Sequence, residues 1–124
     1  MQKPTLFPRF NEVYETELRK LDQLGRSITV VVQGNKSQSI GVISDDFEDL
    51  PSSVYINNDL TELSYGNKVI LPKEGYNTIK MVWNHTLQDC SLMFERCSVI
   101  SVDFKDFDSS EVTNIEYMFD GAVI

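Results

Sequence analysis

The last third of the chain contains a repeat that decides the expected fold. Residues 87–124 read LQDCSLMFERCSVISVDFKDFDSSEVTNIEYMFDGAVI, in which Met93-Phe94 recurs as Met118-Phe119, 25 positions later. A period of 20–50 residues is typical of proteins built from stacked repeats. The sequence therefore predicts that this region forms successive turns of a solenoid.

The apolar spacing inside each repeat favours a short helix. The spacing i, i+3 and i+7 places residues on one helical face, and it occurs twice: at Leu87, Cys90 and Phe94, and at Val112, Ile115 and Phe119. We therefore expect helices near residues 86–94 and 111–119.

Two alternating segments flank the first of these helices. Large apolar residues alternate with polar ones over residues 79–83 and 99–104, which is typical of strands. Strand, helix and strand in this order form a unit whose two strands lie parallel with a right-handed crossover. We expect Trp83 and Phe104 to lie in one interior column.

The repeat resembles that of the BspA-like leucine-rich-repeat surface proteins. The matching positions are the strand residues 102–104, the turn Phe107-Asp108, the segment Val112-Thr113-Asn114-Ile115, and Cys97. The segment from Cys97 to Val102 is one residue shorter than in that family, and Ala122 stands in place of its second cysteine. The resemblance covers roughly residues 76–124. It implies a strand and helix solenoid and an adhesion or interaction role at the cell surface or outside the cell.

The first part of the chain is predicted to form a helix followed by strands. Asn11 can cap a helix that runs to Leu24, because Tyr14, Leu18 and Leu21 share one face. Short β-branched or apolar runs then predict four or five mostly antiparallel strands, at residues 27–33, 39–43 and 53–56 and in a hairpin over 68–83 whose turn is Pro72 to Gly75.

These elements together predict an α+β fold. An N-terminal helix and a β-rich cap (residues 1–75) precede the start of a leucine-rich-repeat solenoid (residues 76–124), which contains the first one and a half repeats. Because the cap and the first repeat share a core, we expect one cooperative unit.

Charge and composition exclude several classes of function. With 11 Lys and Arg against 19 Asp and Glu in 124 residues, the net charge of −8 argues against nucleic-acid binding. One histidine and two cysteines cannot build the usual zinc motifs, and the acidic run Asp45 to Asp49 lacks the spacing of a calcium loop. We expect no metal and no cofactor. The longest strongly apolar run, residues 28–32, is far too short to span a membrane.

The two cysteines favour a structural role. If one helix carried both, Cys90 and Cys97 would lie about 10.5 Å apart along its axis, too far for a disulfide. Cys90 fills the column that Ile115 fills in the next repeat, as a small buried hydrophobe does. A small cysteine-dependent hydrolase that uses Cys90 or Cys97 with His85 is the enzymatic alternative.

The leading hypothesis is therefore a non-enzymatic protein-interaction or adhesion module. Its partner would be a protein or a surface glycan, and its candidate ligand face consists of Lys80, Val82, Ser101, Asp103 and Lys105. The uncovered last repeat also predicts self-association through the C-terminal end, unless more chain follows.

Localisation has two interpretations. The first ten residues lack the apolar core of a secretory signal peptide, which favours a cytosolic scaffold or adaptor domain, or a chain that is a fragment of a longer one. The resemblance instead implies the cell surface, and the sequons at Asn35 and Asn84 are N-glycosylation candidates.

Overall fold

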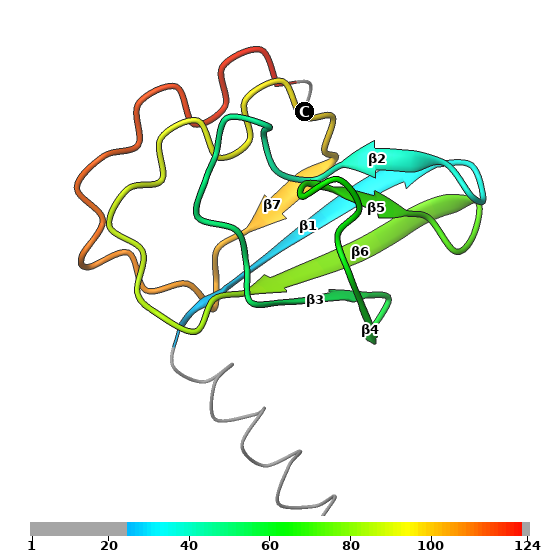
Figure 1. The fold of residues 1–124 in the computed structure, drawn as a ribbon, viewed down its shortest axis with the longest axis horizontal. Helices are drawn as coiled ribbons and strands as arrows, with labels where there is room; N and C mark the ends of the chain where they lie inside the picture. Colours follow the sequence, from blue (N-terminus) through cyan, green and yellow to red (C-terminus); the bar gives the residue numbers. More distant parts are fainter. Residues whose placement is uncertain (1–24, 123–124) are drawn as a thin grey trace, which may run out of the picture.

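The computed structural model describes residues 25–122, which form an all-β fold of two antiparallel sheets (Figure 1). The larger sheet has the order β4-β3-β6-β1-β7, and the smaller one pairs β2 with β5. The strands are β1 (Ser27–Gly34), β2 (Ser39–Gly41), β3 (Ser53–Ile56), β4 (Asp59–Thr61), β5 (Lys68–Ile70), β6 (Gly75–Val82) and β7 (Ser101–Asp103). No helix occurs within residues 25–122, so the α+β prediction is wrong there. The helix expected over residues 11–24 lies outside the described residues.

Strand β1 lies inside the larger sheet, between β6 and the edge strand β7. It pairs along its whole length with β6, from Ser27↔Val82 to Gly34↔Gly75, and on its other edge with β7. The two strands of the expected unit, β6 and β7, run parallel to each other as predicted, but no helix connects them and they are not neighbours in the sheet. Both strands run antiparallel to β1, and β1 separates them.

The turns agree with the sequence better than the pairings do. Asn57 and Asn58 link β3 to β4 with φ of 51° and 75°, and asparagine tolerates this left-handed conformation in tight hairpins. The segment Pro72 to Gly75 also connects two strands as predicted, with Gly75 at φ 95°. However, β5 pairs with β2, and β6 pairs with β1 and β3, so these two strands form no hairpin with each other.

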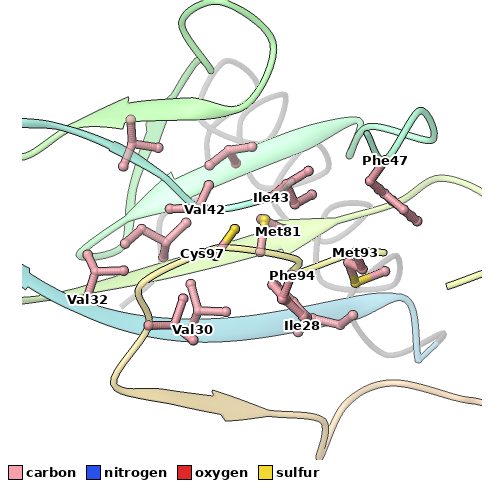
Figure 2. Packing of buried hydrophobic residues seen from close by; sticks show 14 of the residues in the cluster. Ile28, Val30, Val32, Val42, Ile43, Phe47, Met81, Met93, Phe94 and Cys97 are labelled. Carbon is pink, nitrogen blue, oxygen red and sulfur yellow. The ribbon is translucent and has the colours of Figure 1, made fainter. Parts of the chain in front are cut away.

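One face of the larger sheet packs into the core. Because side chains alternate along a strand, Ile28, Val30 and Val32 of β1 all point inward and are fully buried, and Figure 2 shows them beneath Val42, Ile43, Met81 and Phe94. Trp83 and Phe94 are fully buried, as expected. Phe104 is 37% exposed, so it does not lie in an interior column with Trp83 as predicted, and Phe119 is exposed to the same extent.

The repeat forms two stacked coils, residues 86–97 (the first coil) and 111–122 (the second coil). The backbone N–H groups of the first coil donate to carbonyls of the second, in the pairs Cys90 to Asn114 (2.8 Å), Leu92 to Glu116 (3.1 Å), Phe94 to Met118 (2.8 Å) and Arg96 to Asp120 (2.9 Å). An α-helix would direct the same N–H groups to carbonyls four residues earlier in the chain. The predicted helices at 86–94 and 111–119 are therefore wrong.

Backbone conformation nevertheless repeats with the predicted period of 25 residues. Leu92 and Tyr117 have φ of 65° and 57°, and Arg96 and Gly121 have φ of 61° and 70°. Left-handed residues at these positions interrupt any helix. They turn each coil so that it follows the outline of its neighbour.

An acidic loop, residues 42–50, covers the other side of the first coil. The Ser44 N–H donates to the Met93 carbonyl (2.8 Å), and the Ser44 hydroxyl donates to Glu95 Oε1 (3.1 Å). Loop, first coil and second coil thus lie side by side in that order (Figure 1). The first coil is enclosed between two neighbours, and the second has a neighbour on one side.

Truncation of Phe94 should test the packing of the first coil. Its ring is fully buried and stacks on Phe119 with centroids 5.5 Å apart, so we expect Phe94→Ala to lower the free energy of unfolding by about 3–5 kcal/mol in urea melts. Phe104→Ala is the matched control and should cost about 1 kcal/mol, because that ring is partly exposed. Equal losses from both substitutions would contradict this packing.

Candidate functional site

The candidate binding surface is the outer face of the larger sheet, the side directed away from the core cluster. Strand register fixes a row of side chains across it. Lys80 of β6 lies opposite Tyr55 of β3 on one side and opposite Thr29 of β1 on the other, and Thr29 in turn lies opposite Asp103 of β7. We call Tyr55, Lys80, Thr29 and Asp103 the outer row.

The outer row combines different chemical groups at the spacing of neighbouring strands, about 4.8 Å. It presents a phenol, an ammonium, a hydroxyl and a carboxylate in that order. Tyr55, Lys80 and Thr29 are half-buried, and Asp103 is exposed. Rigid paired strands hold their backbone, so the arrangement of these groups is fixed before any ligand arrives.

Three of the five predicted ligand-face residues meet on this outer face. Lys80 and Asp103 belong to the outer row, and Ser101 lies opposite Val31 in the next row. Lys105 is exposed just beyond β7, where its N–H donates to Asp103 Oδ1 (2.8 Å). Val82 is only 4% exposed, so its side chain is not available to a ligand, contrary to the prediction. It lies opposite both Ser27 and Ser53, at the end of β6.

Sequence reasoning missed Tyr55 and Thr29, because the outer row depends on which strands are neighbours. The residues of the row come from four strands that are far apart in the chain. The apolar alternation of β1 indicates that Thr29 faces away from the core, but no sequence signal places β1 between β6 and β7.

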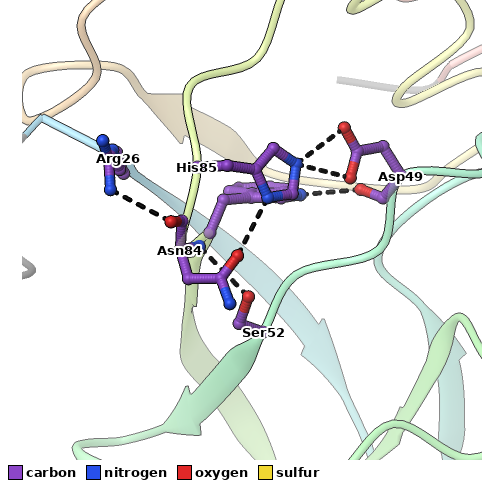
Figure 3. Close-up of polar contacts among 6 residues, drawn as sticks. Arg26, Asp49, Ser52, Asn84 and His85 are labelled. Atoms are coloured by element: carbon purple, nitrogen blue, oxygen red, sulfur yellow. Dashed lines mark hydrogen bonds and ion pairs between the residues drawn. The ribbon is translucent and has the colours of Figure 1, made fainter.

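A cluster of polar residues lies just after the end of β6, and Figure 3 shows His85 there between two hydrogen-bond partners, Asp49 and Asn84. Its Nε2 lies 2.9 Å from Asp49 Oδ1, and its Nδ1 lies 2.9 Å from Asn84 Oδ1. The backbone carbonyl of Asn84 accepts a hydrogen bond from the Arg26 guanidinium (3.0 Å), and the backbone N–H of Asn84 donates to the Ser52 hydroxyl (3.1 Å). Trp83 Nε1 donates to the Asp49 carbonyl (2.6 Å). The cluster fastens the acidic loop to the sheet.

Cys90 and Cys97 are both free, and Cys90 is buried, as predicted; Cys97 is buried as well. Burial raises the pKa of the Cys90 thiol to about 11, and the charges of Asp89 and Asp49 act in the same direction. Burial also raises the pKa of Cys97 to about 11, aided by Asp45 and Glu95. The thiolate is the nucleophilic form, so each thiol is held in its unreactive state at neutral pH.

The acidic run is an ordered loop rather than an array of ligands. Phe47 anchors it in the core, and Asp45 Oδ1 accepts from the buried Asn67 amide. Across residues 25–122, no three His, Cys, Asp or Glu side chains are grouped so as to hold a metal ion. In the same part of the chain, no helix could span a membrane.

The sequon residues Asn35 and Asn84 are both exposed. Comparison with protein-family models, with curated proteins and with solved structures finds no match. The described residues 25–122 form an all-β domain in which two stacked coils pack beside the larger sheet.

The raised thiol pKa values predict a loss of stability at alkaline pH. Below about pH 9, both thiols are protonated in the folded and unfolded chains, and their contribution to stability is complete. As the pH rises toward 11, the unfolded chain ionises first, so the free energy of unfolding should fall.

Urea melts at about pH 8 and about pH 10 measure this fall. The double variant Cys90→Ala, Cys97→Ala is the control, because it retains every lysine and tyrosine. Its stability should fall less between the two pH values than that of the natural chain. An equal fall in both proteins would contradict the assigned thiol pKa values.

Proposed function

We propose that this chain is a non-enzymatic protein-interaction module that binds its partner through the outer face. The carrying observation is the register that aligns Tyr55, Lys80, Thr29 and Asp103 across four strands. Fixed rows of mixed polar and aromatic groups suit recognition of a protein surface, because each group finds a complementary one at a set spacing. The resemblance to surface proteins supports an adhesion role for this module.

A cytosolic scaffold or adaptor is the second candidate, and it would use the same face. The two differ in compartment. Both sequon asparagines are exposed, so mapping of glycans at Asn35 and Asn84 on protein from its native host separates the two candidates. Occupied sites would exclude the cytosol.

The cysteine hydrolase is disfavoured by the surroundings of its proposed residues. Both ring nitrogens of His85 contact Asp49 and Asn84 rather than a thiol. A thiol of pKa about 11 without a neighbouring base is a poor nucleophile.

Site-specific photo-cross-linking tests the proposed face. Benzoylphenylalanine replaces Ser101, on the outer face, or Ser109, which is equally small and exposed but lies outside the sheet, in the segment that leads from β7 to the second coil. Each protein is irradiated with the surface-protein fraction of the native host. We expect discrete adducts at position 101 only, and we expect Asp103→Lys to remove them by reversing a charge in the outer row.

Identical adduct patterns at positions 101 and 109, or no adduct at position 101, would contradict the proposal. Surface glycans arrayed on glass provide the parallel probe for the alternative partner. Binding to the array that Asp103→Lys leaves unchanged would place the ligand elsewhere on the chain.

A further inference from the structure

A polar cleft of about 390 Å³ opens between the smaller sheet and the end of the first coil. Four parts of the chain that are distant in sequence line it: Gln33 at the end of β1, the smaller sheet with Asn67 beside it, the acidic loop, and residues 95–98. Small-molecule sites typically have volumes of about 300–1,000 Å³. None of the four outer-row residues lines the cleft, so it is separate from the proposed protein-binding face.

Hydrogen bonds hold the walls of the cleft together. The Ser44 N–H donates to the Met93 carbonyl of the first coil (2.8 Å), and the Val42 N–H donates to the Asn67 carbonyl (2.9 Å). The Asn67 side chain also donates through Nδ2 to the Ile43 carbonyl (3.1 Å). The acidic loop is therefore tied to the coil on one side and to the smaller sheet on the other. A site that is formed in advance costs less to order when a ligand binds.

Ionised side chains line the cleft without pairing with one another. They are two cations, Lys68 and Arg96, and three carboxylates, those of Asp45, Asp46 and Glu95. In the described part of the chain, Lys68 and Arg96 form no ion pair and no side-chain hydrogen bond, and the Asp46 carboxylate accepts none. Because these groups do not neutralise one another, each remains able to hydrogen-bond to a ligand.

Uncharged donors and acceptors complete the lining. The side chains of Gln33 and Ser98 make no hydrogen bond within the described residues, and Gln38 uses only its Oε1, which accepts from the Asn35 N–H (2.8 Å). Asn67 is 7% exposed, and its Oδ1 is a buried acceptor for which residues 25–122 supply no donor. An unpaired buried acceptor is costly, and a donor from a bound ligand would satisfy it.

We propose that this cleft binds a neutral saccharide. A hydroxyl group both donates and accepts hydrogen bonds, so neighbouring sugar hydroxyls can donate to the Asp46 carboxylate and accept from Arg96 or Gln33. Hydrogen bonds with an ionised partner are about twice as strong as neutral ones. Ile40 and Ile43, which also line the cleft, offer apolar contact to the C–H groups of a sugar ring.

The charge of the site selects against other small ligands. Three carboxylates outnumber two cations in the lining, and the whole chain carries a net charge of −8, so an acidic sugar would be repelled. A zwitterionic amino acid could bond to charges of both signs. However, it carries too few polar atoms for the amide and hydroxyl groups that also line the cleft. A neutral sugar meets both conditions.

Titration of the isotope-labelled chain, followed by NMR, tests the proposal. The probes are the methyl glycosides of glucose, galactose and mannose, together with N-acetylglucosamine, at millimolar concentrations. We expect at least one of these four sugars to shift the backbone amide signals of Ser44, Asn67 and Arg96 in a saturable way. The amide signals of Thr29 and Asp103, in the outer row, should stay in place.

A matched pair of substitutions in the acidic loop tests the assigned carboxylate. No described residue donates to the Asp46 side chain, so Asp46→Asn should leave stability unchanged while the Kd of the bound sugar rises by about tenfold. Glu48→Gln is the control, because Glu48 is an exposed carboxylate of the same loop that does not line the cleft. It should leave the Kd unchanged.

Glucuronate and glycine serve as comparison probes. Tighter binding of either one than of every neutral sugar would overturn the proposal. It would also be overturned if none of the four sugars gave saturable shifts at the cleft, or if Asp46→Asn and Glu48→Gln changed the Kd equally. Cross-linking at position 101 does not involve the cleft, so failure at one site is distinguishable from failure at the other.

Discussion

The whole arrangement depends on β1 being paired along both of its edges. Val30 lies opposite Ile79 of β6 on one side and opposite Val102 of β7 on the other. Because β6 and β7 flank the same strand, the chain between them must cross from one side of β1 to the other. The first coil makes that crossing, and its buried residues Leu87, Met93 and Phe94 cover the inner face of the sheet. The same pairing aligns the outer row on the opposite face.

In the coils, the backbone N–H and C=O groups need hydrogen-bond partners although the chain there forms neither a helix nor a sheet. A buried N–H without a partner costs about 1–3 kcal/mol, and the first coil avoids that cost by donating to the second. Asp89 and Asn114 cap the intervening amides with their side chains. Leu92 and Arg96 adopt the left-handed conformation, and in the coil that they shape every second N–H donates to the neighbouring coil. Each coil is thus complete only when another lies beside it.

The sequence predicted the local features and missed those that depend on distant contacts. The β-branched run at 27–33 indicates a strand because Ile28, Val30 and Val32 alternate, and β1 lies there. The 25-residue repeat is real in both hydrogen bonding and φ. The helices were wrong because the first coil buries Leu87, Cys90 and Phe94, a spacing that one face of a helix would also give. Gly121 was the one available warning, since it stands where Arg96 adopts a left-handed conformation. For the site, polarity and alternation identified Lys80, Ser101 and Asp103, but only the order of strands shows that Thr29 and Tyr55 belong with them.

Strand β1 joins the sheet and the coils into one unit, and native-state hydrogen exchange in increasing denaturant tests this coupling directly. Amides in β1 and β6 report on the sheet, and the Phe94 amide, which donates to Met118, reports on the coils. If β1 couples them, the exchange free energies of all three should converge on one value, the free energy of global unfolding. If Phe94 instead exchanges through an opening of much lower free energy while β1 and β6 stay protected, the coils unfold independently of the sheet, and β1 does not couple the two.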